Sequence, residues 1–142
     1  MKEKRAYYHW IYALFPVVYL YSYNIEEVIL QEVLLPFAIS LTAGVLIWGL
    51  FRLVVRNPQK SALLTFLALF MFYTFGHFMN IFRSSLSDGA KQASYLVYPW
   101  IAVFIGLSIL VFRTRKNLNP LTALLNVCIL SLFLKTQVSH FF

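Results

Sequence analysis

The charged residues of this chain gather in short clusters, and between the clusters lie five long windows without any charge. The windows cover residues 6–25, 33–51, 61–82, 92–112 and 117–134, with lengths of 20, 19, 22, 21 and 18 residues. A helix rises about 1.5 Å per residue, so about 20 residues cross the roughly 30 Å hydrocarbon core of a bilayer. Because backbone groups inside lipid must be hydrogen-bonded within their own segment, each window is expected to be helical.

We therefore expect an all-α fold, an integral membrane helical bundle with about five transmembrane helices, in which residues 1–142 form a single transmembrane domain. The spans are expected near residues 7–23, 36–55, 60–82, 95–112 and 119–138, with a short interfacial helix near 25–35. Asn24 and Glu27 have the spacing of a capping box for that short helix. Pro36 is then expected to turn the chain into the second span.

Two dipeptides indicate where later helices begin. Asn57-Pro58 and Asn119-Pro120 each place a good N-cap residue before a proline. Proline is favoured at the first helical position, because the N–H that it lacks would have no partner there. These dipeptides therefore predict the starts of the third and fifth spans.

The basic residues are distributed unequally between the two sides of the predicted membrane. Nine of the twelve lie at the N-terminus and in the second and fourth connections, and three lie on the opposite side. The nine are Lys2, Lys4, Arg5, Arg52, Arg56, Lys60, Arg113, Arg115 and Lys116. Lys and Arg accumulate in cytoplasmic loops, so we expect the N-terminus inside and the C-terminus outside. The formal net charge of +7 is thereby explained as an orientation signal, and no nucleic-acid partner is expected.

The most distinctive polar stretch lies near the outer end of the third span. Tyr73, Gly76, His77 and Asn80 are three or four residues apart and share one helix face. An ionisable residue at membrane depth suggests a proton-relay or ligand-contact role for His77. The alternative is packing, in which Gly76 allows close helix approach while His77 and Asn80 bond a neighbouring helix. We favour packing, because no span contains an Asp or Glu.

Other chemistry has little support in the sequence. His9, His77 and His140 have no recognisable metal-ligand spacing, and Cys128 lies in an apolar span where a thiol stays protonated. We expect no enzymatic activity, no catalytic or metal-binding residues and no cofactor. With 12% charged and 61% hydrophobic residues, the chain also has too few charges to cover an ordinary soluble enzyme.

Small and polar residues inside the spans are expected to pack helices together. Ser40 and Gly44 form a small-xxx-small pair, and Asn126 is expected to make an interhelical hydrogen bond. Gly49, Gly76 and Gly106 extend the set of small residues on helix faces.

The order of these motifs resembles a known family. A basic start and an aromatic first span precede Tyr23-Asn24-Ile25, and a pre-helix then leads to Leu34-Leu35-Pro36. The Phe-Gly-His-Phe-Met-Asn stretch at 75–80 and Asn119-Pro120-Leu121-Thr122 follow. This is similar to the N-terminal membrane region of bacterial membrane-anchored sulfatase-like proteins of the alkaline-phosphatase superfamily. The resemblance implies a bacterial inner-membrane anchor that would carry an extracytoplasmic catalytic domain after its C-terminus. No catalytic residue of that domain is found in this sequence, so we expect either a fragment of a longer protein or a stand-alone relative of the anchor region.

Three functions are compatible with these features. The first is a multi-pass membrane anchor or assembly module, surrounded by membrane lipids and packed against partner membrane subunits or a C-terminal extracytoplasmic domain. The second is a small accessory subunit of a larger membrane protein complex. The third is a transporter or membrane-embedded enzyme that uses His77 with Tyr73 and Asn80.

Overall fold

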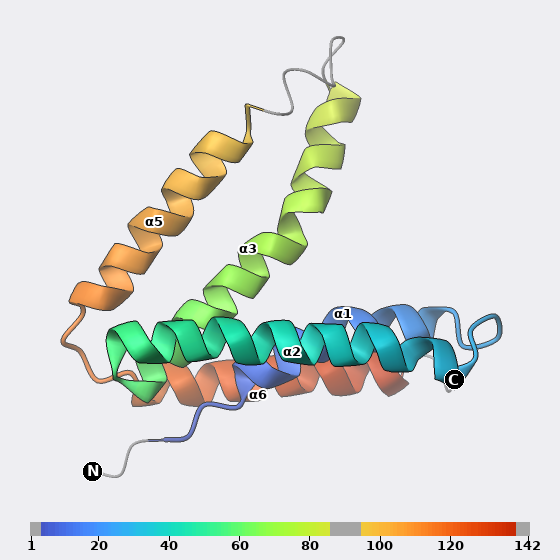
Figure 1. The fold of residues 1–142 in the computed structure, drawn as a ribbon, viewed down its shortest axis with the longest axis horizontal. Helices are drawn as coiled ribbons and strands as arrows, with labels where there is room; N and C mark the ends of the chain where they lie inside the picture. The colour runs from blue at the N-terminus through green and yellow to red at the C-terminus, as the bar shows by residue number, and fades with distance from the viewer. Residues whose placement is uncertain (1–3, 86–94, 139–142) are drawn as a thin grey trace.

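The computed structural model describes residues 4–85 and 95–138 of the chain. Every element in this part of the chain is a helix, as Figure 1 shows. The helices are α1 (Tyr8–Tyr23), α2 (Leu30–Val55), α3 (Pro58–Ser85), α5 (Val97–Arg113) and α6 (Asn119–Val138). The predicted all-α fold is confirmed, and the helices lie close to the expected spans except around residues 25–35.

Three helices are long and apolar enough to cross a membrane. They are α2, the Pro58–Ile81 part of α3 and the Asn119–Thr136 part of α6. The α5 helix is also apolar but has only 17 residues, and α1 has 16. These lengths and compositions indicate a helical membrane protein.

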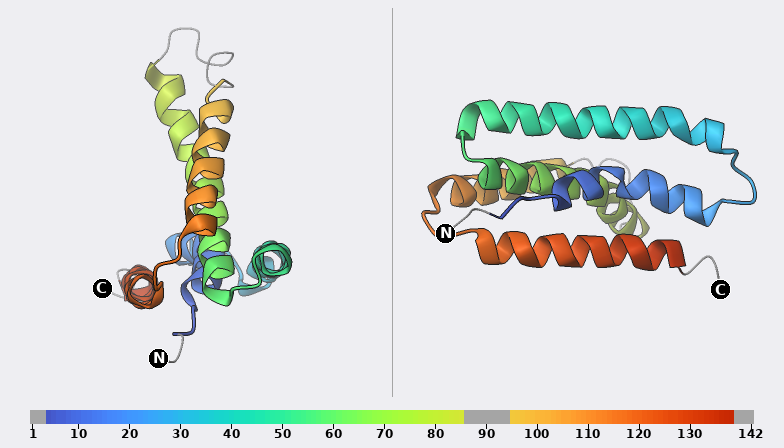
Figure 2. Two further views of the ribbon diagram at one scale, coloured as in Figure 1. Left: turned by 90° about the vertical axis from the view of Figure 1, so that its left-hand side faces the viewer. Right: turned by 90° about the horizontal axis from the view of Figure 1, so that it is seen from below.

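The helices form a three-helix layer and a projecting hairpin. The α1, α2 and α6 helices run side by side, with α1 between the other two, as the views in Figures 1 and 2 agree. The α3 helix begins beside this layer and then diverges from it, and α5 returns along α3. We call α3 and α5 the α3–α5 hairpin. Its second helix packs mainly on α3, and none of the residues of α5 is buried.

The buried core lies where α1, α3 and α6 converge. Tyr8, Ala62 and Ile129 pack together there, and only 1% of the Tyr8 side chain is exposed. Most other large apolar side chains face outward, and Leu53 on α2 is 78% exposed. An outer surface of this kind is covered by lipid in a membrane protein, so little internal burial is required of it.

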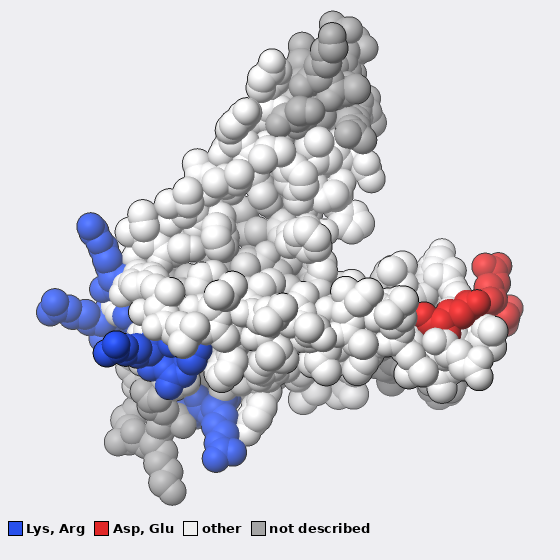
Figure 3. Space-filling view, viewed as in Figure 1, with Lys and Arg blue, Asp and Glu red and all other residues white. Residues whose placement is uncertain are grey.

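Opposite charges gather at opposite ends of the three-helix layer (Figure 3). Arg52 lies in the last turn of α2, beside the start of α3, while Glu32 lies in the first turn of α2. At about 1.5 Å per residue, the helix between them is about as long as a bilayer core is thick. The stretch of α2 between these two charges is therefore uncharged and of membrane length.

A tight turn joins α2 to α3 at the basic end. Arg56 adopts the left-handed conformation, with φ at 57°, and its N–H donates to the carbonyl of Arg52 at 3.2 Å. The Asn57 Oδ1 then accepts the N–H of Lys60 at 3.0 Å, which confirms the predicted cap before Pro58. This N-cap satisfies one of the otherwise unpaired N–H groups at the start of α3.

The structure differs from the sequence prediction at residues 25–35, where no separate interfacial helix forms. Asn24 instead ends α1, with its N–H and its Nδ2 both donating to the carbonyl of Leu20. The next helix begins at Leu30 and continues through Pro36. Breaking α2 at Pro36 would leave four N–H and four C=O groups without partners, whereas Pro36 removes a single donor. Continuing the helix through Pro36 therefore costs less free energy than ending it there.

Candidate functional site

Three helices meet at one backbone carbonyl, that of Ala13 in α1. Its oxygen accepts the Ser40 hydroxyl of α2 at 2.5 Å and the Tyr73 hydroxyl of α3 at 3.1 Å. The two hydroxyls also lie 3.2 Å apart, within hydrogen-bond distance. Pro16 lies one turn further along α1 and removes one donor from its ladder. We call Ala13, Ser40 and Tyr73 the three-helix junction. Its hydrogen bonds connect α3 to the layer.

Gly44 lets α2 approach α1 closely beside this junction. A Cβ atom added at Gly44 would lie 3.0 Å from the Cβ of Ala13, which is closer than ordinary contact. The predicted small-xxx-small pair Ser40 and Gly44 is therefore confirmed as a packing surface, with α1 as the partner helix.

A cavity of about 460 Å³ opens where α3 diverges from α1 beyond the junction. It is lined by Tyr12, Phe15, Pro16, Tyr19, Leu20, Tyr73, Thr74 and His77. Tyr73 lies 5.9 Å from Tyr12 between ring centroids, so aromatic rings form its inner wall. None of the lining residues is acidic, and the cavity is therefore aromatic with a single ionisable imidazole.

Only half of the predicted polar face of α3 lines this cavity. Tyr73 and His77 line the cavity, whereas Gly76 and Asn80 are not among its lining residues. A Cβ atom at Gly76 would meet no atom within 4 Å, because α3 has already diverged from the layer there. Gly76 is thus not a site of close helix approach within the described residues. In the same part of the chain, His77 and Asn80 donate no hydrogen bond to another helix.

At the basic end, Asn126 of α6 holds the segment that leads into α1. Its Oδ1 accepts the N–H groups of Tyr7 and Tyr8 at 2.9 and 3.0 Å, and its Nδ2 donates to the carbonyl of Arg5 at 3.0 Å. The first N–H groups of a helix have no partner within it. Asn126 therefore acts as a cap for α1 supplied by another helix, more specific than the interhelical bond that the sequence predicted.

Asn119 also bonds the N-terminal segment, which corrects its predicted role as the cap of its own helix. Its Oδ1 accepts the N–H of Lys4 at 2.8 Å and the Nε2 of Gln59 at 2.6 Å. Gln59 donates in addition to the carbonyl of Lys4 at 3.1 Å. Asn117 accepts the N–H of Asn119 at 2.9 Å and takes the local role instead. The sequence showed polar residues here but could not show that the N-terminal segment would lie between them.

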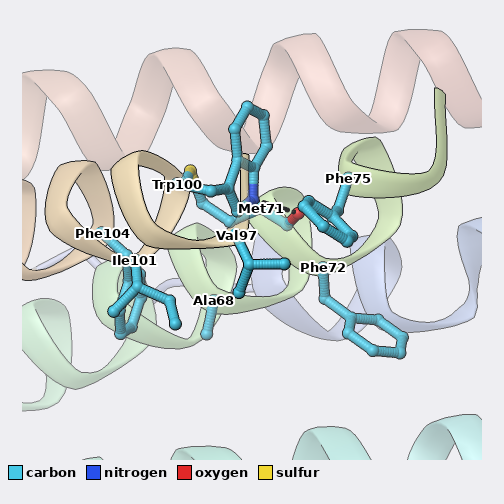
Figure 4. Close-up of a pocket in the computed structure, with 8 residues that line it drawn as sticks. All are labelled: Ala68, Met71, Phe72, Phe75, Val97, Trp100, Ile101 and Phe104. Carbon is cyan, nitrogen blue, oxygen red and sulfur yellow. Dashed lines mark hydrogen bonds between the residues drawn. The ribbon is translucent and has the colours of Figure 1, made fainter. Parts of the chain in front are cut away.

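A second cavity, an open apolar groove of about 300 Å³, lies between α3 and α5. Figure 4 shows its lining side chains, which include Met71, Phe75, Trp100 and Phe104. The indole N–H of Trp100 donates to the carbonyl of Met71 at 3.0 Å, and its ring lies 5.9 Å from that of Phe75. Trp100 is therefore the main attachment of α5 to α3.

The remaining candidate residues from the sequence are His9, His140 and Cys128. Among the residues that the structure describes, no three His, Cys, Asp or Glu side chains come together in a way that would hold a metal ion. Cys128 is exposed on α6, and His140 lies outside the described residues. His9 is buried.

Comparisons with protein-family models, with curated proteins and with solved structures give no match for this chain. The resemblance to the membrane region of sulfatase-like proteins thus stays a prediction from the sequence.

Proposed function

We propose that this chain is a multi-pass membrane anchor and assembly module. Its five helices would cross a bacterial inner membrane, with the N-terminus in the cytoplasm and the C-terminus outside. The segregation of Lys and Arg from Asp and Glu along the layer supports this orientation (Figure 3). In this arrangement the chain has no catalytic role of its own.

The observation that carries the assembly role is the position of the α3–α5 hairpin. The α5 helix packs mainly on α3, has no buried residue, and stands apart from the three-helix layer (Figure 2). Helices in membranes associate through side-chain packing, since lipid already satisfies apolar surface. A hairpin with so little internal packing leaves faces that a helix of a partner membrane protein can pack against. We propose that α5 is the main docking helix.

Photo-crosslinking in intact membranes tests the assembly role. A photoreactive amino acid is placed at Ile105 on α5 and, as a matched control, at Leu46 on α2, since both side chains are exposed. We expect a discrete crosslinked protein band from position 105 and only lipid adducts from position 46. Lipid adducts alone from both positions would contradict the assembly role.

Reporter fusions test the orientation. A periplasmic-only enzyme reporter and a cytoplasm-only fluorescent reporter are each fused after Phe142, and a second pair is inserted in the turn at Asn57. We expect the periplasmic reporter to be active after residue 142 and the fluorescent reporter to be active at residue 57. The reverse pattern would show that the proposed orientation is wrong.

The anchor role includes an extracytoplasmic domain after the C-terminus, as the resemblance to sulfatase-like proteins implies. Sequencing the native reading frame tests this part separately. A frame that continues past Phe142 into a soluble domain rich in Asp and His would support it. A frame that stops at Phe142 would leave the accessory subunit of a larger membrane complex as the form of the assembly role.

The cavity at His77 supports a second candidate, a transporter or membrane-embedded enzyme. It brings His77 and Tyr73 to one space of about 460 Å³, large enough for part of an amphipathic ligand. The test is complementation of a deletion strain by a His77→Leu variant expressed at the normal level. Full complementation would eliminate a chemical role for His77, and failure to complement would favour it.

A further inference from the structure

A third cavity, of about 260 Å³, lies at the basic end of the molecule. It is formed by the N-terminal segment, the first turn of α1, the end of α2 and the start of α3. The residues important to its chemistry are Lys4, Arg5, His9, Trp10, Trp48 and Gln59. We call this space the His9 cavity, and it is separate from the cavity at His77.

His9 is the unusual member of this set. Its side chain is 2% exposed, and within the described part of the chain neither ring nitrogen has a hydrogen-bond partner. Its ring centroid lies 4.5 Å from that of Trp10 and 6.4 Å from that of Trp48. A buried polar group without a partner costs about 1–3 kcal/mol. An imidazole that packs against two indoles and has no hydrogen-bond partner in the described part of the chain is therefore expected to meet a polar group of a ligand.

The other lining groups restrict the charge of that ligand. Lys4 and Arg5 lie at the cavity, and none of its lining residues is acidic. The side-chain nitrogen of Gln59 is already committed to the Lys4 carbonyl and to Asn119. Two cationic side chains and one imidazole thus face the cavity without an acidic residue beside them, and together they favour an anion.

The geometry points to the headgroup of an anionic phospholipid, and phosphatidylglycerol is the probe used to test it. A neutral imidazole offers one donor and one acceptor. A phosphodiester oxygen would accept from one ring nitrogen of His9, and Lys4 and Arg5 would neutralise the phosphate. Trp10 and Trp48 supply the apolar and aromatic wall typical of the membrane interface. Basic pockets between helices on the cytoplasmic side bind such headgroups.

This inference rests on the transmembrane placement proposed above but not on the assembly role. A headgroup phosphate and a soluble phosphate ester share the same chemistry. We assign the lipid, because the cavity lies at the end of helices whose length matches a bilayer core and whose outer surface is apolar.

Native mass spectrometry of the purified full-length chain tests the assignment. The protein in a neutral detergent is titrated with phosphatidylglycerol, with phosphatidylcholine and, as the soluble arm, with glycerol 1-phosphate. We expect saturable binding of phosphatidylglycerol, weaker binding of phosphatidylcholine and no competition by glycerol 1-phosphate. Equal binding of the two lipids, or displacement of the lipid by the soluble ester, would overturn the assignment.

Two matched pairs of variants locate the site. His9→Leu is compared with Cys128→Leu, a change to leucine at an exposed position that lines neither cavity. Lys4→Gln/Arg5→Gln is compared with Arg115→Gln/Lys116→Gln, since each removes two charges at the same end. We expect each first variant to weaken phosphatidylglycerol binding about tenfold or more, as the loss of a charge-assisted hydrogen bond does, and each control to change it less than twofold. If His9→Leu does not fold, the charge pair decides. Equal losses in the charge pair would show that binding is not at the His9 cavity.

Discussion

The hydroxyl of Tyr73 donates to the carbonyl oxygen of Ala13 across 3.1 Å, from the helix that diverges to the helix at the centre of the layer. Ser40 donates to the same oxygen from a third helix. Beyond this point α3 leaves the layer, and the cavity at His77 opens. One carbonyl therefore marks the boundary between the packed part of the molecule and the part that is open to lipid or a partner.

Replacing Tyr73 with Phe should destabilise the three-helix layer modestly. The variant loses the bond to Ala13 but keeps the ring, and side-chain hydrogen bonds in membrane proteins average about 0.6 kcal/mol, with a maximum near 1.7. The measurement is reversible unfolding in mixed micelles. Tyr98→Phe is the control, because Tyr98 is 71% exposed. Equal stability of the two variants would show that the junction does not hold α3.

Enlarging Gly44 should be far more damaging than enlarging Gly49. A side chain at Gly44 would meet Ala13, whereas one at Gly49 would meet nothing within 4 Å. We expect Gly44→Leu to cost about 1–3 kcal/mol of unfolding free energy, as overpacking usually does, and Gly49→Leu to cost less than about 0.5 kcal/mol, as surface substitutions usually do. The same unfolding assay measures both, and the prediction fails if the two variants are equally stable.

Replacing Asn126 with Leu should release the segment before α1. The N–H groups of Tyr7 and Tyr8 would lose their acceptor, and the carbonyl of Arg5 would lose its donor. Hydrogen–deuterium exchange at the amides of residues 7 and 8 should become at least about tenfold faster, since each 1.4 kcal/mol of lost protection is a factor of ten. Cys128→Leu, an exposed change on the same helix, should leave these rates unchanged. Unaltered exchange in Asn126→Leu would rule out its capping role.

Removing the indole of Trp100 should loosen the α3–α5 hairpin alone. Trp100→Leu loses the bond to the Met71 carbonyl and the ring contacts with Phe75 and Phe78. Because α5 packs mainly on α3, we expect faster amide exchange in residues 97–113 and unchanged exchange in α1 and α6. A uniform increase through all helices would mean that the hairpin and the layer unfold as one unit.

Several features of the fold follow from local sequence patterns. An uncharged window of membrane length must be helical in lipid, whatever surrounds it, so helices were predictable near their observed positions. The cap at Asn57 was also predictable, because an Asn before a Pro acts within four residues. The Ser40 and Gly44 pair was recognisable as a packing surface, although its partner was not.

Predictions failed where the residue type was compatible with more than one hydrogen-bond partner, near or distant in the sequence. Asn119 has the sequence of a local cap but bonds Lys4 and Gln59, and Asn24 ends α1 when it was expected to begin another helix. Gly76, expected to pack against another helix or a partner, lies on the diverging part of α3 and has no neighbour within 4 Å among the described residues, so its packing role stays a prediction. For Asn119 the residue type limited the possible bonds, and the positions of the N-terminal segment and of α3 selected among them.

The sequence by itself determined the helices, their lengths and the segregation of charge, because these depend on neighbours along the chain and on the thickness of a bilayer. Only the tertiary structure decided that His77 lines a cavity, that Asn126 caps α1 and that His9 is buried against two indoles without a hydrogen-bond partner in the described part of the chain. These relations join residues tens of positions apart, and the packing angle between helices, which no local pattern encodes, places them together.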